Sequence, residues 1–285
     1  MRLLFCGVRG STSAPGIDFV RVGGHTSCVA LAHDGQPWSL LLDAGTGIRR
    51  VTKQLGGRAF KGALVLTHLH WDHVEGLPFF AAGDRDDARV RVLIPDQGGA
   101  NVTDVLARAM SPPHFPIGPD GLRGNWTFEA VTPGRHRVEG FEIEAFDVPH
   151  KGGRTFGLRV DELNASGGAA ASIAYLPDHH PEPATNAEIA RVCDGVDLLV
   201  HDSQFLAGEQ AIADAYGHAT IDDAIALAKQ SRARTLALFH HGPARTDDEV
   251  DAIGRRFGGQ AAAGQGVEVI VAREESIIEL GGGSP

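Results

Sequence analysis

A short segment of the chain, LTHLHWDH at residues 66–73, brings together three histidines and one aspartate. His68 and His70 are separated by one residue, so in an extended backbone their imidazoles point to the same side and can share one ion. Asp72 and His73 follow where a helix-like segment begins, and we expect them to face a second position. Imidazoles and carboxylates without thiolates suit zinc, iron or manganese in a catalytic centre that keeps a position open for water. A helix cap at Asp72 would not explain three neighbouring histidines, so the segment predicts a metal centre.

Short apolar runs recur along the chain, and each ends in a histidine or an aspartate. They are SLLLDAGTG at 39–47, GALVLTHLH at 62–70, FEIEAFDVPH at 141–150, ASIAYLPD at 171–178, DLLVHDSQF at 197–205 and TLALFHH at 235–241. Each run has the length and apolar content of a strand. The pattern therefore predicts six strands that deliver polar side chains at their tips.

Helical patterns lie between these strands. They cover residues 72–83, 101–110 after a cap at Asn101, 220–230 after Thr220 and 246–257 after Thr246. MRLLF at 1–5 predicts the first strand, and residues 266–280 predict the last two. The strands first follow one another in mixed runs and later alternate with helices. This order indicates an α/β fold, with two sheets packed face to face and helices outside. We expect one domain at 1–280 and a disordered tail at 281–285.

Composition limits the function classes. The chain has 285 residues and a formal net charge of −10, which disfavours a polynucleotide or an anionic membrane as partner, although a local basic patch could hold one phosphate. Its three cysteines lack a CxxC pattern, which argues against a disulfide framework or a thiolate site and favours a reducing cytoplasm. No apolar run reaches the roughly 18 to 20 residues that cross a bilayer.

The segment SPPHFPIGPDGLRGNW at 111–126 is different, since its prolines and glycines exclude regular structure. Phe115, Ile117 and Trp126 nevertheless favour burial. Two readings remain open: an ordered loop that overhangs the site, with His114 near substrate, or a surface loop held by its own aromatic side chains.

THLHWDH resembles the signature of the metallo-β-lactamase superfamily, and the later motifs DVPHKGG, YLPDHH and LALFHHGP follow in that family's order. The resemblance covers nearly the whole chain and implies an αββα sandwich of two mixed sheets with metals at one edge. It implies that one ion is held by His68, His70, His150 and Asp178, and a second by Asp72, His73, Asp178 and His240. His241 is a rival for the last position.

The bridging position holds Asp178, which resembles the hydrolase branches of that superfamily, including glyoxalase II and the phosphodiesterases, whereas the antibiotic-degrading branch commonly has cysteine. GHAT at 217–220 resembles an additional histidine motif of the phosphodiesterase branch, which includes tRNase Z and PhnP-type cyclic phosphodiesterases. The resemblance implies a dinuclear hydrolase with two divalent ions, zinc first and manganese or iron as alternatives. Such ions activate water and neutralise phosphoryl oxygens, while His218 protonates the leaving oxygen. The other reading of His218 is a packed histidine at a helix start.

Further residues are candidates for supporting roles. Asp43 and Asp202 stand at strand ends, where each could orient a ligating histidine or cap a turn. Arg9, Lys151 and Arg154 lie nearest to the expected site loops and could hold a phosphate oxygen, or be solvated. The loop GVRGSTSAPG lacks the spacing of a nucleotide-binding P-loop.

The preferred hypothesis is a phosphodiesterase acting on a small or cyclic phosphodiester, such as a cyclic nucleotide. A tRNA substrate is disfavoured by the acidic charge and by the lack of a long arm rich in glycine and lysine. Alternatives are a thioester or lactone hydrolase, in which His218 has no clear task, and a non-catalytic metal-bound ligand sensor. A homodimer is compatible with the sequence.

Overall fold

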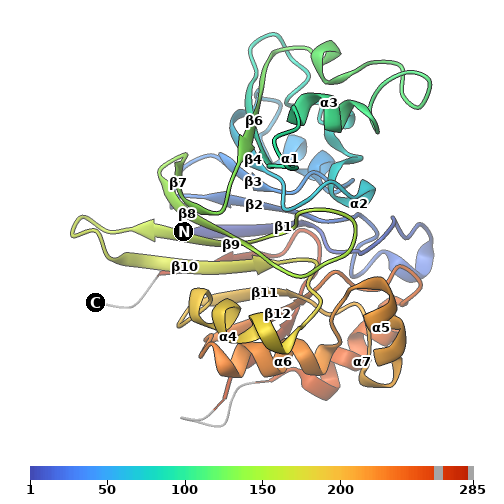
Figure 1. Ribbon diagram of the computed structural model, residues 1–285, viewed down its shortest axis with the longest axis vertical. Coiled ribbons are helices and arrows are strands. Elements are labelled where there is room, and N and C mark those ends of the chain that lie inside the picture. Colours follow the sequence, from blue (N-terminus) through green and yellow to red (C-terminus); the bar gives the residue numbers. More distant parts are fainter. Residues whose placement is uncertain (260–265, 282–285) are drawn as a thin grey trace.

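Two seven-stranded β-sheets form the middle of the molecule in the computed structural model, which describes residues 1–259 and 266–281 (Figure 1). The first sheet has the order β14-β1-β2-β3-β4-β5-β6, with β1 (Arg2–Gly7), β2 (Cys28–Ala32), β3 (Leu40–Leu42), β4 (Lys61–Val65), β5 (Arg89–Pro95), β6 (Asn125–Val131) and β14 (Ile277–Glu279). The second has the order β13-β12-β11-β10-β9-β8-β7, with β7 (Gly134–Val138), β8 (Phe141–Asp147), β9 (Phe156–Leu163), β10 (Ala169–Leu176), β11 (Leu198–Asp202), β12 (Thr235–Phe239) and β13 (Glu268–Val271).

Both sheets are mixed. Strands β3 to β6 pair in parallel, whereas β14, β1, β2 and β3 pair antiparallel. In the second sheet β10 to β13 are parallel and β7 to β10 are antiparallel. Apolar side chains of both inner faces, such as Phe5, Phe156 and Phe239, form a shared core.

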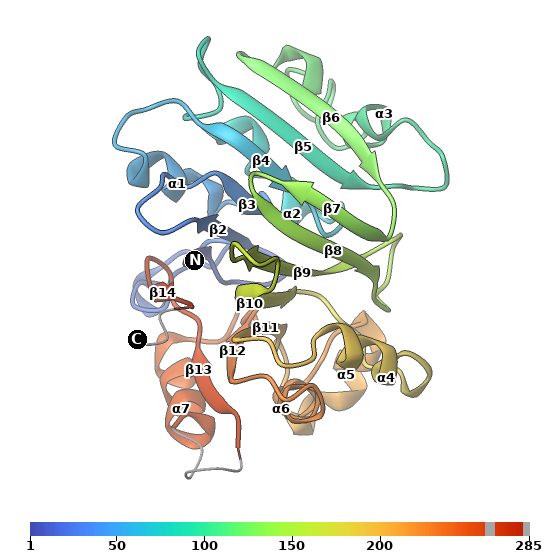
Figure 2. The same cartoon turned by 90° about the vertical axis from the view of Figure 1, so that its left-hand side faces the viewer.

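Helices cover the two outer faces, which confirms the predicted αββα sandwich. They are α1 (Ile48–Gln54), α2 (Trp71–Val74), α3 (Val102–Ala107), α4 (Pro183–Val192), α5 (Gln210–Tyr216), α6 (Ile221–Gln230) and α7 (Asp247–Phe257). Figure 2 shows α1 and α3 beside the first sheet and α6 and α7 beside the second. Each outer layer has its own apolar cluster, with Val51 of α1 in one and Leu227 of α6 in the other.

The predicted helix starts agree with the structure at three places. Asn101 accepts hydrogen bonds from Thr103 N and Asp104 N, and Thr220 and Thr246 form capping boxes. The helix predicted at 72–83 is instead the single turn of α2 followed by a 3₁₀ turn at Leu77–Phe79. Glycine at position 76 disfavours helix, and proline at 78 has no N–H to donate to the preceding turn.

The segment 111–126 is a loop held by its own aromatic side chains. Phe115 packs edge-on against Phe79 with ring centroids 5.7 Å apart, and Trp126 Nε1 donates to Gly83 O over 3.1 Å. His114 is exposed. Of the two open readings, this packing supports the surface loop held by its own aromatic side chains. Most of the tail predicted to be disordered, residues 282–285, lies outside the described residues. Every described helix is too short or too polar to span a membrane.

The strand ends explain how distant residues meet. Because β10, β11 and β12 are parallel, their carboxyl ends share one edge of the second sheet, and β8 runs the same way since both it and β10 pair antiparallel with β9. Strands β3 and β4 likewise end together. The polar residues predicted at strand tips therefore gather at one edge of the sandwich.

Candidate metal centre

All seven residues predicted as metal ligands lie together at this edge. His68, His70, His150 and Asp178 form one group, and Asp72, His73 and His240 form a second, each with possible ligand atoms within 4.8 Å of one another. The loops after β4, β8, β10 and β12, together with the short helix α2, supply them. The histidines and aspartates of this fold indicate a site for divalent metal ions.

Asp178 stands between the two groups and turns one oxygen toward each. Its Oδ2 lies 3.4 Å from His150 Nε2 and 3.7 Å from His68 Nε2. Its Oδ1 lies 3.0 Å from His73 Nε2 and 3.1 Å from His240 Nε2. One carboxylate can therefore serve two positions at once.

Several polar atoms at this point are buried without a hydrogen-bond partner among the described residues. They are His68 Nε2, His73 Nε2 and Asp178 Oδ1. Buried polar atoms are nearly always satisfied, so a cluster of unsatisfied ones facing each other requires an explanation. Lone pairs of neutral imidazole and carboxylate converging on one space fit a cation.

The charges of the surrounding side chains also favour a bound cation. Burial alone would raise the pKa of Asp178, but the neighbouring His240, His73 and His68 hold it well below its usual value. Burial lowers the pKa of His73, but the carboxylates of Asp178, Asp72 and Asp43 outweigh it and hold this pKa well above its usual value. The centre is thus an anionic environment that favours positive charge.

Asp43 orients His73. This is one of the two roles considered for Asp43, the other being a turn cap. Its Oδ2 lies 2.8 Å from His73 Nδ1, so Nε2 of that ring is left to face Asp178. The same carboxylate accepts from Thr67 N over 2.7 Å and from the Tyr175 hydroxyl over 3.0 Å. A fully bonded carboxylate of this kind fixes both the tautomer and the direction of its histidine.

His218 lies beside the centre and lines the same cavity. Its Nδ1 is 2.8 Å from Asp202 Oδ2, and its Nε2 has no hydrogen-bond partner among the described residues. Burial lowers the pKa of His218, but Asp202 outweighs this and raises it to about 9. An imidazole held by a carboxylate at one nitrogen can donate a proton from the other to a leaving oxygen.

His240, and not His241, faces the other candidate ligands. His240 Nε2 lies 3.2 Å from Asp72 Oδ2, within the centre. His241 points the other way and donates from Nε2 to Ala272 O over 3.0 Å, and burial lowers its pKa to about 3. His241 is therefore a neutral structural histidine.

Arg9 takes neither of the two roles considered for it, a phosphate contact or a solvated surface position. Arg9 is fully buried, and its guanidinium donates to Gly23 O over 2.7 Å and to Arg245 O over 2.6 Å. Lys151 is exposed next to His150, and Arg154 is partly exposed and paired with Asp147. Lys151 and Arg154, unlike Arg9, therefore lie where they can reach a bound phosphate.

Sequence reasoning missed the role of the first glycine-rich loop. The backbone N–H of Ser11 donates to Asp72 Oδ2 over 2.7 Å, and the Ser11 hydroxyl meets the side-chain amide of Gln204. A Cβ at Gly10 would collide with the His240 ring. The Gly and Ser content of GVRGSTSAPG was the available signal, since it indicates close backbone approach.

The centre opens where three depressions meet. A cavity of about 670 Å³ is lined by Asp72, Asp178, His218 and the aromatic side chains of Trp71 and Tyr216. A second, of about 570 Å³, shares His150 with the first.

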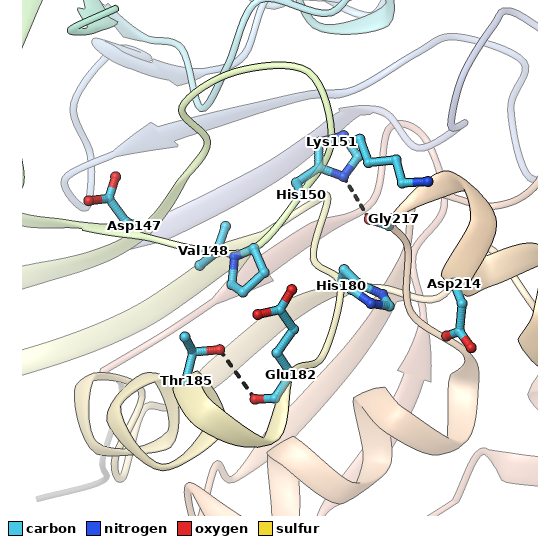
Figure 3. A pocket seen from close by; sticks show the side chains of 10 residues that line it. Asp147, Val148, His150, Lys151, His180, Glu182, Thr185, Asp214 and Gly217 are labelled. Carbon is cyan, nitrogen blue, oxygen red and sulfur yellow. Dashed lines mark hydrogen bonds between the residues drawn. The ribbon is translucent and has the colours of Figure 1, made fainter. Parts of the chain in front are cut away.

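Figure 3 shows the second cavity, with His150 Nδ1 bonded to Gly217 O over 2.7 Å and Lys151 beside it. A third cavity, of about 350 Å³, shares Leu69 with the first and is lined by Arg108 and Arg154. No described residue of the 111–126 loop lines any of the three.

Comparisons with known proteins agree with this geometry. A family model described as "Beta-lactamase superfamily domain" matches residues 39–241. Ribonuclease Z of Metallosphaera sedula is 31% identical over 246 residues, covering 71% of this chain and 78% of that protein. Ribonuclease Z of Lacticaseibacillus casei is 30% identical over 242 residues, covering 70% of this chain and 74% of that protein.

The fold has a solved counterpart in the crystal structure of the short form of human tRNase Z. The TM-score is 0.67 at 22% sequence identity, covering 98% of this chain and 99% of that one. The relatives at 30% identity or above also correct one expectation. The prediction that a polynucleotide is disfavoured as partner is wrong, because these relatives are ribonucleases.

Proposed function

We propose RNA as the substrate of this chain, which belongs to the metallo-β-lactamase superfamily and is a metal-dependent hydrolase that acts on phosphodiesters. The names of its relatives favour RNA over the small or cyclic phosphodiester that the sequence suggested. The acidic net charge limits non-specific attraction to RNA but does not prevent binding through local contacts.

The proposed ligand assignment follows the two oxygens of Asp178. His68, His70 and His150 would hold one ion with Oδ2, and Asp72, His73 and His240 a second with Oδ1. Zinc suits this set of imidazoles and carboxylates, with manganese or iron as alternatives. When bound, such ions lower the pKa of water and neutralise charge on the phosphate.

The observation that carries the phosphodiester part of the proposal is the pair formed by His218 and Asp202. A ribose alkoxide is a poor leaving group that must gain a proton, whereas the thiolate released from a thioester needs none. The Asp202 carboxylate, 2.8 Å from His218 Nδ1, stabilises the protonated ring, and His218 itself lines the cavity. This arrangement favours a phosphodiester over a thioester.

The shape of the surroundings supports an extended substrate. The first cavity, which contains the centre, adjoins both of the others. It shares His150 with the second cavity and Leu69 with the third. A nucleotide strand can continue from the scissile phosphate into these depressions, past Lys151 on one side and Arg154 on the other. A single cyclic nucleotide would leave most of this surface unused.

The test compares metal-loaded wild-type protein on labelled RNA with an unpaired 3′ extension, on cyclic nucleotides and on a thioester. We expect metal-dependent cleavage of RNA, and much weaker turnover in the His218→Ala variant. His114→Ala, which changes an exposed histidine outside the cavities, is the matched control and should cleave normally. Thioester turnover indifferent to His218, or tight ligand binding without any turnover, would reject the proposal.

A further inference from the structure

Two large aromatic side chains are exposed at the mouth of the cavity that holds the candidate metal centre. Trp71 is 75% exposed and Tyr216 is 65% exposed, yet both line the same cavity as Asp178. Trp71 begins α2 and Tyr216 ends α5, so they come from opposite halves of the sandwich (Figure 1). The candidate metal centre thus has an aromatic group on each of its two sides.

Exposing an indole and a phenol to water forfeits the free energy that burial would provide, and such apolar groups beside a site commonly mark a binding surface. Leu69, Phe205 and Ile212 add apolar side chains to the lining of the same cavity. The flat faces of indole and phenol match the flat faces of nucleobases, which stack on such rings whatever their sequence.

The net charge of the chain gives a second reason to expect base stacking on Trp71 and Tyr216. RNA-binding surfaces usually gain much of their affinity from many Lys and Arg contacts to phosphate. This chain carries a net charge of −10, and no lysine or arginine is among the described residues that line the cavity beside Trp71 and Tyr216. An acidic enzyme that holds a polyanion needs a contribution that does not depend on charge, and stacking provides one.

We propose that Trp71 and Tyr216 form an aromatic clamp that stacks on unpaired bases next to the scissile phosphate, so that the enzyme selects single-stranded over paired RNA. The inference rests on the proposed function. Bases within a duplex already stack on their neighbours and cannot splay out onto protein side chains, whereas bases in single strands can.

A binding experiment tests the clamp without turnover. Fluorescein-labelled octaadenylate is titrated into metal-loaded His218→Ala protein, alone and combined with Trp71→Ala or Tyr216→Ala. We expect each truncation to raise Kd on the order of 10-fold. Trp71→Phe and Tyr216→Phe should restore most of the affinity, because a ring remains. The matched control is Phe79→Ala, an exposed aromatic in the following turn that lies outside the cavity lining.

An abasic strand separates stacking from a general structural effect. Octamers without bases should bind the His218→Ala protein weakly, and Trp71→Ala should weaken them no further. Equal losses for normal and abasic strands would overturn the clamp, since Trp71 would then act without touching a base. Loss of a dimer in Trp71→Ala with unchanged RNA affinity would also overturn it.

Kinetics on the active enzyme distinguish the two hypotheses. Trp71→Ala should raise KM for single-stranded RNA with little change in kcat, and the preference over duplex should fall. RNA cleavage with an unaltered KM in both truncations would reject the clamp and leave the proposed function intact. Failure of the wild-type enzyme to cleave or bind any RNA would reject both.

Discussion

Asp202 contacts His218 and also lies near His240: its Oδ2 is 2.8 Å from His218 Nδ1, and its Oδ1 is 4.0 Å from His240 Nδ1. The carboxylate also accepts from the backbone N–H groups of His179 and Ala219, each over 3.2 Å. One fully buried side chain at the end of β11 therefore fixes the candidate acid relative to the candidate metal centre.

The first prediction concerns the leaving group. His218→Ala should lower kcat about 100- to 10,000-fold on RNA, whose leaving alkoxide must be protonated. The same variant should lose much less on bis(p-nitrophenyl) phosphate, because p-nitrophenolate leaves without a proton. Steady-state rates on both substrates at saturating metal provide the comparison.

The Asp202→Asn variant tests how much the negative charge of Asp202 contributes to proton donation by His218. Asparagine can still accept from His218 Nδ1 but removes the negative charge, so kcat on RNA should lie between wild type and His218→Ala. An equal loss on both substrates in His218→Ala would show that His218 supports the site and donates no proton.

The second prediction concerns Asp43. Asp43→Asn should weaken metal binding about 10- to 100-fold, because the amide no longer holds His73 in the tautomer that leaves Nε2 free. Competition with a chromophoric chelator measures this affinity. Tyr175→Phe is the control: it removes one of the hydrogen bonds to Asp43 and should cost stability of about 1 kcal/mol while sparing the metal. Equal metal loss in both variants would contradict the orienting role.

Much of this arrangement could be predicted from the sequence, because the signals are local. The apolar runs that precede Asp43, Asp178 and His240 form β3, β10 and β12, and the cap residues Thr220 and Thr246 begin α6 and α7. Strand periodicity and capping depend on neighbouring residues alone, so they can be read without a structure.

Other features depend on contacts between distant residues. Asp43 and His240 both adopt positive φ, 60° and 59°, directly after their strands, and no residue pattern indicates this strained backbone. The burial of Arg9 arises from carbonyls at Gly23 and Arg245, far away in the chain. The bond from Ser11 N to Asp72 likewise spans the fold.

The third prediction concerns Lys151, which is exposed between the centre and the neighbouring cavity. If its ammonium contacts one RNA phosphate, Lys151→Ala should reduce the slope of log K against log salt by about 0.7. RNA binding at several salt concentrations measures the slope. Lys229→Ala, an exposed lysine on α6, should leave it unchanged. An unaltered slope in Lys151→Ala would exclude that phosphate contact.

The last prediction concerns alkaline stability. Cys193 is buried directly after the last residue of α4, and burial raises its pKa to about 12. An unfolded thiol has a pKa of about 8.5, so below that pH both states keep the proton and the stability contribution is complete. At higher pH the unfolded chain loses the proton first, and the free energy of unfolding falls by about 1.4 kcal/mol per pH unit.

Urea unfolding from pH 8 to pH 10.5 tests this. The stability difference between wild type and Cys193→Ala should narrow as pH rises, because alanine has no proton to lose. Val192→Ala, a truncation of the adjacent buried side chain, should keep a constant difference from wild type over the same range. A constant difference for Cys193→Ala would mean that the thiol ionises equally in both states, contrary to its burial in the outer helical layer.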